Sequence, residues 1–454
     1  MQKLFSDTRK LDASCRAAYG LTEEIMMENA AAALEKEIRE HAKPGEKVMI
    51  LCGGGNNGAD GYTLARRIRL DFEVKVYQCG EPNSNLCKLQ ADRAEKCGVA
   101  FNKISNIPIG DIRTSAVIVD CIFGAGFHGS YSNDIVEHIV TALNDVNSAS
   151  CWKIACDVPT GIAGDGVVTS AAFRADVTIT MGAQKLSLYS DMAKDYVGQV
   201  KVANLGISRS LYENSCNDPQ ESAYLLEKSD MCLPYRKDSM VNKGSFGNAY
   251  IACGVKTGAS LIAANACFRF GAGLVTLIRP EEGFERSYVP GMTMELLMAS
   301  KFGTRVSALC VGMGLGFDET VIKYYMDYLL NNSEVRCVLD ADVMYSPLIV
   351  DVLSQRGKGC VLTPHPKEFA ELLRICGLGE YNIDECIIRR IELVEKFCRR
   401  FPEVVLLAKG ANPVIGCFTM EKGLKMYINN NGSVALAKGG TGDALAGMIC
   451  ALLT

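Results

Sequence analysis

The sequence contains many cysteines but lacks the spacing that metal-binding cysteines show. Its 454 residues include 20 cysteines, no two of which stand three positions apart, and only four histidines, His41, His128, His138 and His365. A structural zinc site needs clustered cysteine and histidine ligands. We therefore expect no zinc site. Most cysteines lie in apolar runs such as "ALCVG", where they are expected to be small buried hydrophobic residues, while a redox role for some of them stays open.

The sequence also lacks a strong charge excess and a long hydrophobic run. The net charge is −4 and the isoelectric point is near 5.8, which argues against a nucleic-acid or anionic-membrane surface. The run "ALAGMICALL" has only ten residues, whereas a membrane-spanning helix needs about 20. The opening "MQKLFSDTRKLD" has no apolar core of a signal peptide. We therefore expect a cytoplasmic protein with neither a nucleic-acid nor a membrane partner.

What the sequence does have is an alternation of short apolar runs with longer amphipathic ones. In the first half, the runs predicted as strands are residues 47–53, 73–80, 115–124, 152–158, 175–182 and 198–207, and those predicted as helices are 22–42, 59–70, 83–98 and 132–146. Strands that are apolar on both faces and separated by helices predict a doubly wound parallel sheet. The fold class is therefore α/β, with a Rossmann-like first domain.

The pattern lapses in the polar stretch "ENSCNDPQES" and then restarts. In the second half, strands are predicted at 248–254, 273–280, 307–314, 336–342, 359–366 and 404–415, with helices at 257–273 and 385–401. We predict a first domain over residues 1–212, a linker over 213–222 and a second α/β domain over 223–454.

Three oxygen-rich loops in the first half follow predicted strands. They are "GGGNNGADG" (53–61), "DCIFGAGFHG" (120–129) and "CDVPTG" (156–161). Ligands of an open parallel sheet bind at the carboxyl ends of its strands, and glycine-rich loops there offer backbone amides to a phosphate. Asn57, Asp120 and Thr160 add oxygens that suit a hard cation, and Asp157 stays available for proton transfer. Gly53, Gly55 and Gly58 fit G-x-G-x-x-G, but this spacing alone suits a structural turn equally well, and Asp120 could be a turn former.

In this order, together with the earlier "MENAAAAL", the three loops resemble the epimerase domain of NAD(P)H-hydrate repair enzymes over most of residues 1–210. The resemblance implies that Asn57, Asp120 and Thr160 hold potassium and that Asp157 is the catalytic acid/base. The substrate-binding residues that it implies are Asn56, Asn57, Gly58, Ala59, Asp60, Gly124, Ala125, Gly126, Phe127, His128, Gly129 and Asp157. Ala59 stands where the family has Gly, and Thr160 stands where it has Ser.

A second glycine-rich loop lies near the C-terminus, in "KGGTGDALAGMICALL". Gly439, Gly440 and Gly442 stand at the start of a predicted helix, whose amides and dipole favour an anion. The Walker sequence is absent, so this is not a P-loop. Asp443 is placed to take a proton from a hydroxyl beside the phosphate, or serves only as an N-terminal cap. His365, between two prolines at a strand end, is equally consistent with a binding and a structural role.

This half resembles the partner dehydratase of the same repair system, which is similar to the ribokinase superfamily. The motifs that carry the likeness are "KGSFG", "TGAS", "GMGLG", "DAD", "TPHPKEF", "LAKGA" and "KGGTGDALAG". The resemblance implies that Ala259, Gly316, His365 and Asp443 bind the hydrated nucleotide, with Asp443 catalytic. The residues that it assigns to the adenine nucleotide are Lys409, Gly410, Ala411, Asn412, Pro413, Gly439, Gly440, Thr441 and Gly442. Family members usually continue beyond this last helix, so we expect a second domain that is short at its C-terminus.

The two resemblances imply a bifunctional enzyme. The first domain would interconvert the R and S hydrates of NADH and NADPH, and the second would dehydrate the S form with ADP, or ATP, and Mg²⁺, through phosphorylation and loss of phosphate. The implied partners are therefore small molecules (NADHX, NADPHX and ADP), with K⁺ in the epimerase site and a homo-oligomeric assembly. Two alternatives stay open: a ribokinase-like small-molecule kinase, for instance of a hydroxymethylpyrimidine, with an appended nucleotide-binding domain, and a non-catalytic nucleotide-binding protein.

Overall fold

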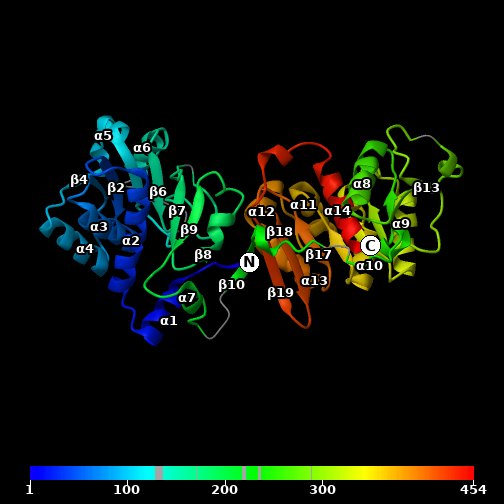
Figure 1. The fold of residues 1–454 in the computed structure, drawn as a ribbon, viewed down its shortest axis with the longest axis horizontal. Helices are drawn as coiled ribbons and strands as arrows, with labels where there is room; N and C mark the ends of the chain where they lie inside the picture. Colours follow the sequence, from blue (N-terminus) through cyan, green and yellow to red (C-terminus); the bar gives the residue numbers. More distant parts are fainter. Residues whose placement is uncertain (128–135, 170, 217–220, 234–236, 288) are drawn as a thin grey trace. The chain divides into compact units, whose positions relative to one another are not determined.

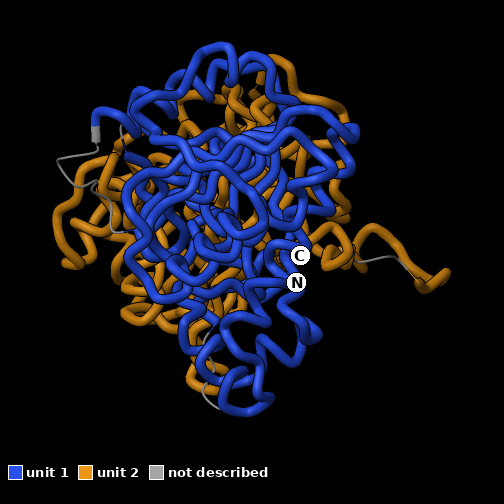
Figure 2. The backbone as a smooth tube through the Cα atoms, turned by 90° about the vertical axis from the view of Figure 1, so that its left-hand side faces the viewer, with its two compact units in different colours: residues 1–225 blue, residues 226–454 orange. Residues whose placement is uncertain are grey.

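The computed structural model describes residues 1–127, 136–169, 171–216, 221–233, 237–287 and 289–454. The chain forms two compact units, Met1–Leu225 and Leu226–Thr454, which Figure 2 colours separately. The predicted linker, residues 213–222, includes residues 217–220, which lie outside the described residues. Within the described ranges, no helix has both the length and the apolar character needed to span a bilayer.

The first unit is built on a sheet of parallel strands (Figure 1). In spatial order its strands are β4 (Phe101–Lys103), β3 (Glu73–Cys79), β2 (Lys47–Gly53), β5 (Ser115–Cys121), β6 (Trp152–Cys156), β7 (Val177–Met181) and β9 (Gln199–Ala203). Its helices are α1 (Arg9–Tyr19), α2 (Glu23–His41), α3 (Asn56–Ile68), α4 (Asn85–Lys96), α5 (Ile109–Thr114), α6 (Val136–Asn147) and α7 (Arg209–Glu213). Short strands β1 (Gln2–Phe5), β8 (Gln184–Lys185) and β10 (Glu221–Leu226) lie outside this sheet.

Both faces of this sheet are buried, as its two hydrophobic cores show. Val48, Ile50 and Cys52 of β2 pack in one core with residues of α2, α3 and α4. The alternating Met49 and Leu51 pack in the other core with residues of α5 and α6. Side chains of successive strand residues point to opposite faces, so a strand covered on both sides must be apolar throughout. The prediction of a doubly wound parallel sheet is confirmed.

The second unit carries a sheet that is parallel at first and antiparallel at its end. The parallel part is β13 (Leu297–Ala299), β12 (Leu274–Ile278), β11 (Asn248–Ala252), β14 (Ala308–Val311), β15 (Arg336–Leu339), β16 (Cys360–Leu362) and β17 (Val405–Ala408). Antiparallel β18 (Val414–Thr419) and β19 (Gly423–Asn429) follow. The helices are α8 (Thr257–Phe270), α9 (Glu319–Asn331), α10 (Ile349–Arg356), α11 (Pro366–Ile375), α12 (Ile383–Ile388), α13 (Arg390–Arg400) and α14 (Thr441–Leu453). Residues of α8 and α14 share one core with β11, β12 and β14, and the predicted α/β class is confirmed here too.

Three predicted elements of the second unit are wrong in detail. The single strand predicted over 404–415 is two antiparallel strands, β17 and β18, joined by the turn at 409–413. The helix predicted over 385–401 is two helices, α12 and α13, which meet at Arg389. Helix α14 begins at Thr441, so Gly442 lies in its first turn instead of before it.

The cysteines are mostly buried single thiols, as predicted. All 20 are free, and only Cys97 and Cys232 are exposed. Strand residues such as Cys52 and Cys121 are completely enclosed in the first unit. Burial raises the pKa of the Cys52 and Cys121 thiols, which keeps both in the unreactive neutral form.

Candidate functional sites

The glycine-rich turn between β2 and α3 is a tight packing element. A Cβ atom on Gly58 would lie only 1.8 Å from the carbonyl oxygen of Gly53, and one on Gly53 would lie 2.0 Å from the carbonyl oxygen of Ile122. Any side chain at either position would collide with backbone. The turn therefore brings the start of α3 close to the end of β5, which places Asn56, Asn57 and Asp60 beside the next loop.

A cavity of about 800 Å³ opens at the carboxyl ends of these strands. Eight of the residues predicted to bind substrate line it: Asn56, Asn57, Asp60, Gly124, Ala125, Gly126, Phe127 and Asp157. Gly58 and Ala59 lie on the same helix but are not among its lining residues, and His128 and Gly129 lie outside the described residues. Sequence reasoning missed Thr8, Arg9, Asp12 and Lys185, which also line it.

Asp157 lies in the cavity wall, with its side chain 14% exposed, and is bonded through both oxygens. Its Oδ1 lies 2.5 Å from the Lys185 ammonium and accepts a 3.1 Å hydrogen bond from the Met181 amide. Its Oδ2 accepts a 3.1 Å hydrogen bond from the Ala125 amide. Its φ is +70°, in the left-handed region, which costs a non-glycine residue of order 1–3 kcal/mol and is tolerated mainly at functional sites. Burial raises the pKa of Asp157, but Lys185 and these amides outweigh burial, so the net pKa is lowered and the carboxylate is ionised at neutral pH.

Asp60 and Asp12 are two further carboxyl groups of the same cavity, and their pKa values are raised instead of lowered. Burial, with Asp157 as a neighbouring negative charge, raises the pKa of Asp60 well above its usual range. Burial also raises the pKa of Asp12, although the Tyr212 hydroxyl donates a 2.6 Å hydrogen bond to it. Among the carboxyl groups of this cavity, Asp157 is therefore ionised, whereas Asp60 and Asp12 retain protons more strongly.

The predicted potassium ligands are partly brought together. Asp120 is completely buried, and it accepts 2.7 Å hydrogen bonds from the amide and the hydroxyl of Thr160 and a 3.1 Å bond from the Ile122 amide. Burial raises the pKa of Asp120 to about 6. The Phe123 amide donates to the Thr160 hydroxyl at 3.0 Å, so the pair lies directly behind the cavity-lining residues Ile122 and Phe123.

Asn57 lies on α3 with its Oδ1 beside Gly124, where a Cβ would be 3.1 Å away, and no bond among the described residues joins it to Asp120 or Thr160. Its amide nitrogen is buried without a hydrogen-bond partner in the described part of the chain. No ion pair involves Asp120 within those same residues. A buried carboxylate that has no cationic partner among the described residues, bonded to a hydroxyl, offers oxygens of the kind that a hard cation prefers.

The second site surrounds the N-terminus of α14. Gly440 precedes the helix with φ +88°, and a Cβ on Gly442 would lie 3.3 Å from the Lys409 ammonium. Lys409 Nζ lies 2.7 Å from Oδ1 of Asp340, which is 2% exposed. The Thr441 hydroxyl is buried without a hydrogen-bond partner among the described residues. A cation, a helix N-terminus and an unsatisfied hydroxyl are all features that favour an anion.

Asp443 stands in the first turn of α14. Its pKa is raised by partial burial and by the negative charges of Asp340, Asp342 and Glu368, against which Lys409 acts. Asp342 accepts a 2.8 Å hydrogen bond from the Gly316 amide, and a Cβ on Gly314 would lie 3.2 Å from the Ala259 side chain. The segments that carry the predicted residues Ala259 and Gly316 are thus tied to neighbouring loops by direct contacts.

The two remaining predicted segments are held by buried groups. His365 caps α11: its Nδ1 accepts from the Glu368 amide at 3.3 Å, and its Nε2 lies 3.0 Å from Glu368 Oε1, so the ring has a structural role whatever it binds. The turn of residues 409–413 lies over Arg390, which is 4% exposed and donates a 3.3 Å hydrogen bond to the Asn412 carbonyl oxygen. A Cβ on Gly410 would lie 2.1 Å from the Arg390 guanidinium. Sequence reasoning missed Arg390 because it lies in a predicted helix far from the turn that it supports.

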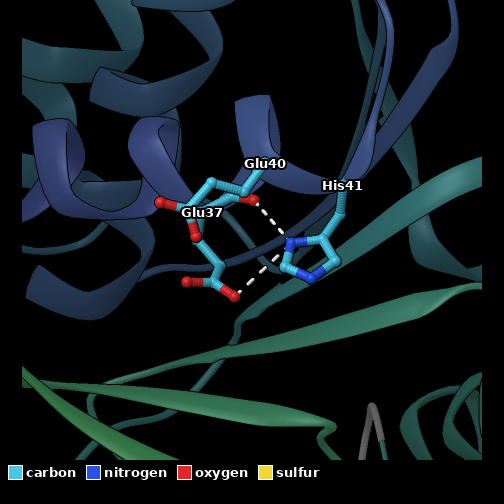
Figure 3. Close-up of side chains that lie close together, drawn as sticks. All are labelled: Glu37, Glu40 and His41. Atoms are coloured by element: carbon cyan, nitrogen blue, oxygen red, sulfur yellow. Dashed lines mark hydrogen bonds and ion pairs between the residues drawn. The ribbon is translucent and has the colours of Figure 1, made fainter.

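One cluster outside these sites resembles a metal centre only at first sight. Glu37, Glu40 and His41 gather at the end of α2 (Figure 3). Lys201 of β9 lies 2.6 Å from Glu37 Oε2 and 4.0 Å from Glu40 Oε2. The His41 ring stacks on Trp152 at 4.0 Å, and its Nδ1 lies 3.0 Å from the Glu37 carbonyl oxygen. The lysine supplies the positive charge that a metal would bring, and the cluster joins α2 to β9 and β6.

These observations describe two α/β units, each with a carboxylate beside a glycine-rich loop at the ends of parallel strands, which is the arrangement of enzymes that act on nucleotides. Residues 23–187 match the model of the YjeF-related protein N-terminus, and residues 249–454 match that of NAD(P)H-hydrate dehydratase. The bifunctional NAD(P)H-hydrate repair enzyme of Helicobacter pylori is 38% identical, over 100% of this chain and 91% of its own length. That of Coxiella burnetii is 31% identical, over 96% of this chain and 86% of its own. The chain belongs to the family of bifunctional NAD(P)H-hydrate repair enzymes.

Among solved structures, a ribokinase-like superfamily protein from Enterococcus faecalis is similar to this chain. It is 21% identical, covers 51% of this chain and 80% of its own, and has a TM-score of 0.40.

Proposed function

We propose that the chain restores hydrated nicotinamide nucleotides, with the first unit interconverting the R and S hydrates and the second dehydrating the S hydrate. The observation that carries this proposal is the 38% identity to the Helicobacter pylori repair enzyme across the whole chain. The division of labour is supported by the two family models, which fall on different compact units. Both reactions act on small molecules.

In the first unit, Asp157 is the acid/base that exchanges a proton with the substrate during epimerisation at C6. It is ionised and part of the wall of the 800 Å³ cavity, so it can act as a base at neutral pH. Asn56, Asn57, Asp60 and the loop of residues 124–129 are the proposed substrate contacts. Asp120, Thr160 and Asn57 are the proposed ligands of K⁺, which when bound would supply a fixed positive charge beside the substrate.

In the second unit, Asp443 takes the proton of the C6 hydroxyl while that oxygen attacks the terminal phosphorus of ADP, or of ATP. The bond from that phosphorus to the rest of the nucleotide breaks, and AMP, or ADP, leaves. The amides at the start of α14, together with Lys409, stabilise the charge on the phosphate as it moves. Cleavage of the C6–O bond then releases inorganic phosphate, a better leaving group than hydroxide, and loss of a proton from C5 restores the double bond. Mg²⁺, bound with the nucleotide phosphates near the carboxylates of Asp340, Asp342 and Asp443, would neutralise phosphate charge. Ala259, Gly316 and His365 are the proposed contacts of the hydrate, and residues 409–413 and 439–442 those of the nucleotide.

The test is recovery of the near-ultraviolet absorbance of reduced nicotinamide from purified hydrates, with ADP, Mg²⁺ and K⁺. Recovery from the R hydrate as sole substrate, faster than its uncatalysed epimerisation allows, requires both units and is the expected result. Recovery from the S hydrate alone would refute the epimerase assignment. If neither hydrate gave any recovery of absorbance, the dehydratase assignment would be refuted. Accumulation of a stable phosphorylated product would identify a kinase instead.

A further inference from the structure

Lys185 is a buried lysine whose ammonium is fully engaged beside the reacting carboxylate. It belongs to the short strand β8, is 4% exposed and lines the cavity. Its Nζ lies 2.5 Å from Asp157 Oδ1, 3.1 Å from the Met181 carbonyl oxygen and 3.2 Å from the Thr180 hydroxyl. An ammonium group has three N–H donors, so these three acceptors fix its direction.

The contacts of Lys185 divide the two oxygens of Asp157 between different tasks. Oδ1 is held by the Lys185 ammonium and the Met181 amide. Oδ2 accepts a 3.1 Å hydrogen bond from the Ala125 amide, its one hydrogen bond within the described residues. A Cβ on Gly124 would lie 3.0 Å from this Oδ2 and 3.1 Å from Asn57 Oδ1, so the oxygen faces a gap that glycine leaves open among proposed substrate contacts.

Most of the other charged residues around the Asp157–Lys185 pair are acidic. Asp60 of α3 and Asp12 of α1 line the same cavity, as do Arg9 and Glu81. The Tyr212 hydroxyl donates a hydrogen bond to Asp12, and the Cys156 thiol lies near Asp60. Lys185 is the cation that opposes the burial of Asp157. A buried ion pair is weak evidence for stability, since an apolar pair of similar volume is often as stable. Its place in a cavity wall is better explained by a need for the charge.

We propose that Lys185 is a positioning residue for epimerisation. Its ammonium anchors Asp157 through Oδ1 and keeps it ionised, and Oδ2 is left as the oxygen that exchanges a proton with the substrate. This inference rests on the proposed function, because it assigns a role within the epimerase reaction. A lysine that only held the fold together would change the rate equally at every pH, whereas one that keeps the base ionised must also set the pH at which activity begins.

The experiment compares Lys185→Met and Lys185→Arg in the full chain. Epimerisation is followed without ADP, as the approach of the pure R hydrate to its mixture with S, between pH 5 and 9. Lys185→Met should lower the rate at neutral pH at least tenfold and move the acidic limb of the profile upward by about 1–3 pH units, because an adjacent opposite charge lowers a carboxyl pKa by about that amount. Lys185→Arg keeps the charge, so its acidic limb should stay in place while its rate falls through altered geometry.

The matched control is Lys153→Met. Lys153 is also buried in the first unit, but its Nζ bonds to the carbonyl oxygens of Ala149 and Cys151, away from the residues that line the cavity. This variant should leave the profile unchanged. If Lys185→Met lowered the epimerisation rate by the same factor at all pH values, the inference would be overturned. If that variant does not fold, a shifted acidic limb in Lys185→Arg would overturn it equally. A wild-type chain without epimerase activity at any pH would instead refute the proposed function.

Discussion

The carboxylates proposed for the two reactions, Asp157 and Asp443, lie in opposite electrostatic settings. The Asp157 side chain is 14% exposed, and its pKa is lowered because Lys185 and backbone amides outweigh the effect of burial. Asp443 is half-buried, and its pKa is raised by that burial and by three other acidic residues. No ion pair to Asp443 occurs within the part of the chain that the structure describes. One unit thus ionises its base with its own lysine, and the other does not.

The lysine of the second unit has a different partner. Lys409 bonds to Asp340 at 2.7 Å, and it stands beside Gly442 at the start of the helix that carries Asp443. A carboxyl group that is surrounded by other acidic residues, as Asp443 is, suits a site whose ligand brings a cation with it. The difference indicates that the base of the first unit is prepared by the protein alone, whereas that of the second unit is completed by what binds there.

The largest test of this difference is Asp443→Asn. Loss of the base should reduce dehydration of both hydrates by about 100- to 10,000-fold, since general base catalysis typically contributes that much. The readout is the ADP-dependent recovery of near-ultraviolet absorbance. Interconversion of the hydrates without ADP should stay at the wild-type rate, which shows that the chain is folded. Dehydration at more than a tenth of the wild-type rate would remove Asp443 from the mechanism.

Asp157→Asn should have a narrower effect. Recovery from the R hydrate should fall to the rate of its uncatalysed epimerisation, a loss of up to about 10,000-fold in the enzymatic step. Recovery from the S hydrate should be unchanged, because only the second unit acts on it. An equal loss with both hydrates would show that the two sites are not separable, and it would contradict the comparison.

The sequence predicted the two carboxylates, Asp157 and Asp443, but not the different electrostatic surroundings of each. The strand over residues 47–53 was predicted with its observed bounds, because an apolar run between turn residues is a local signal. Asp157 and Asp443 are likewise marked by local signals, because Asp157 stands in the loop of residues 156–161 and Asp443 directly follows a glycine-rich loop. Lys185 has no such signal: its role depends on the short strand β8, which places it opposite Asp157, and a lone lysine is normally exposed.

The wrong secondary-structure predictions have a related cause. Residues 404–415 are apolar on both sides of the turn at 409–413, so periodicity does not separate β17 from β18. The break between α12 and α13 falls at Arg389, where neither glycine nor proline marks it. The residues proposed for the nucleotide lie in that turn, and the buried Arg390 beneath them follows that break. Local sequence patterns located the turn at 409–413, but its contact with Arg390 depends on the packing of distant segments.

A third test weakens the ion pair of the second unit. Lys409→Met leaves Asp340 buried without its cation and should destabilise the second unit by about 3 kcal/mol at pH 8, as loss of one partner of a buried pair does. Burial already raises the pKa of Asp340, and loss of Lys409 raises it further. The protonated form is then tolerated, so the destabilisation should shrink at pH 5. Urea denaturation at the two pH values measures this, and an equal loss at both would indicate that the pair is not coupled to protonation.

The smallest expected effect is a stabilisation of the first unit by potassium. Because the pKa of Asp120 is raised to about 6 in the folded chain, this group favours folding at low pH, and that contribution is lost as the pH rises from about 4 to 6. A cation bound to the ionised carboxylate would offset the loss above pH 6. Saturating KCl, compared with choline chloride of equal ionic strength, should therefore stabilise by about 1–3 kcal/mol at pH 8, or roughly 2–10 °C in Tm, and much less at pH 5. Asp120→Asn should abolish the difference between the salts, whereas the same shift in that variant would place any bound potassium elsewhere and leave Asp120 as an unpaired buried acid.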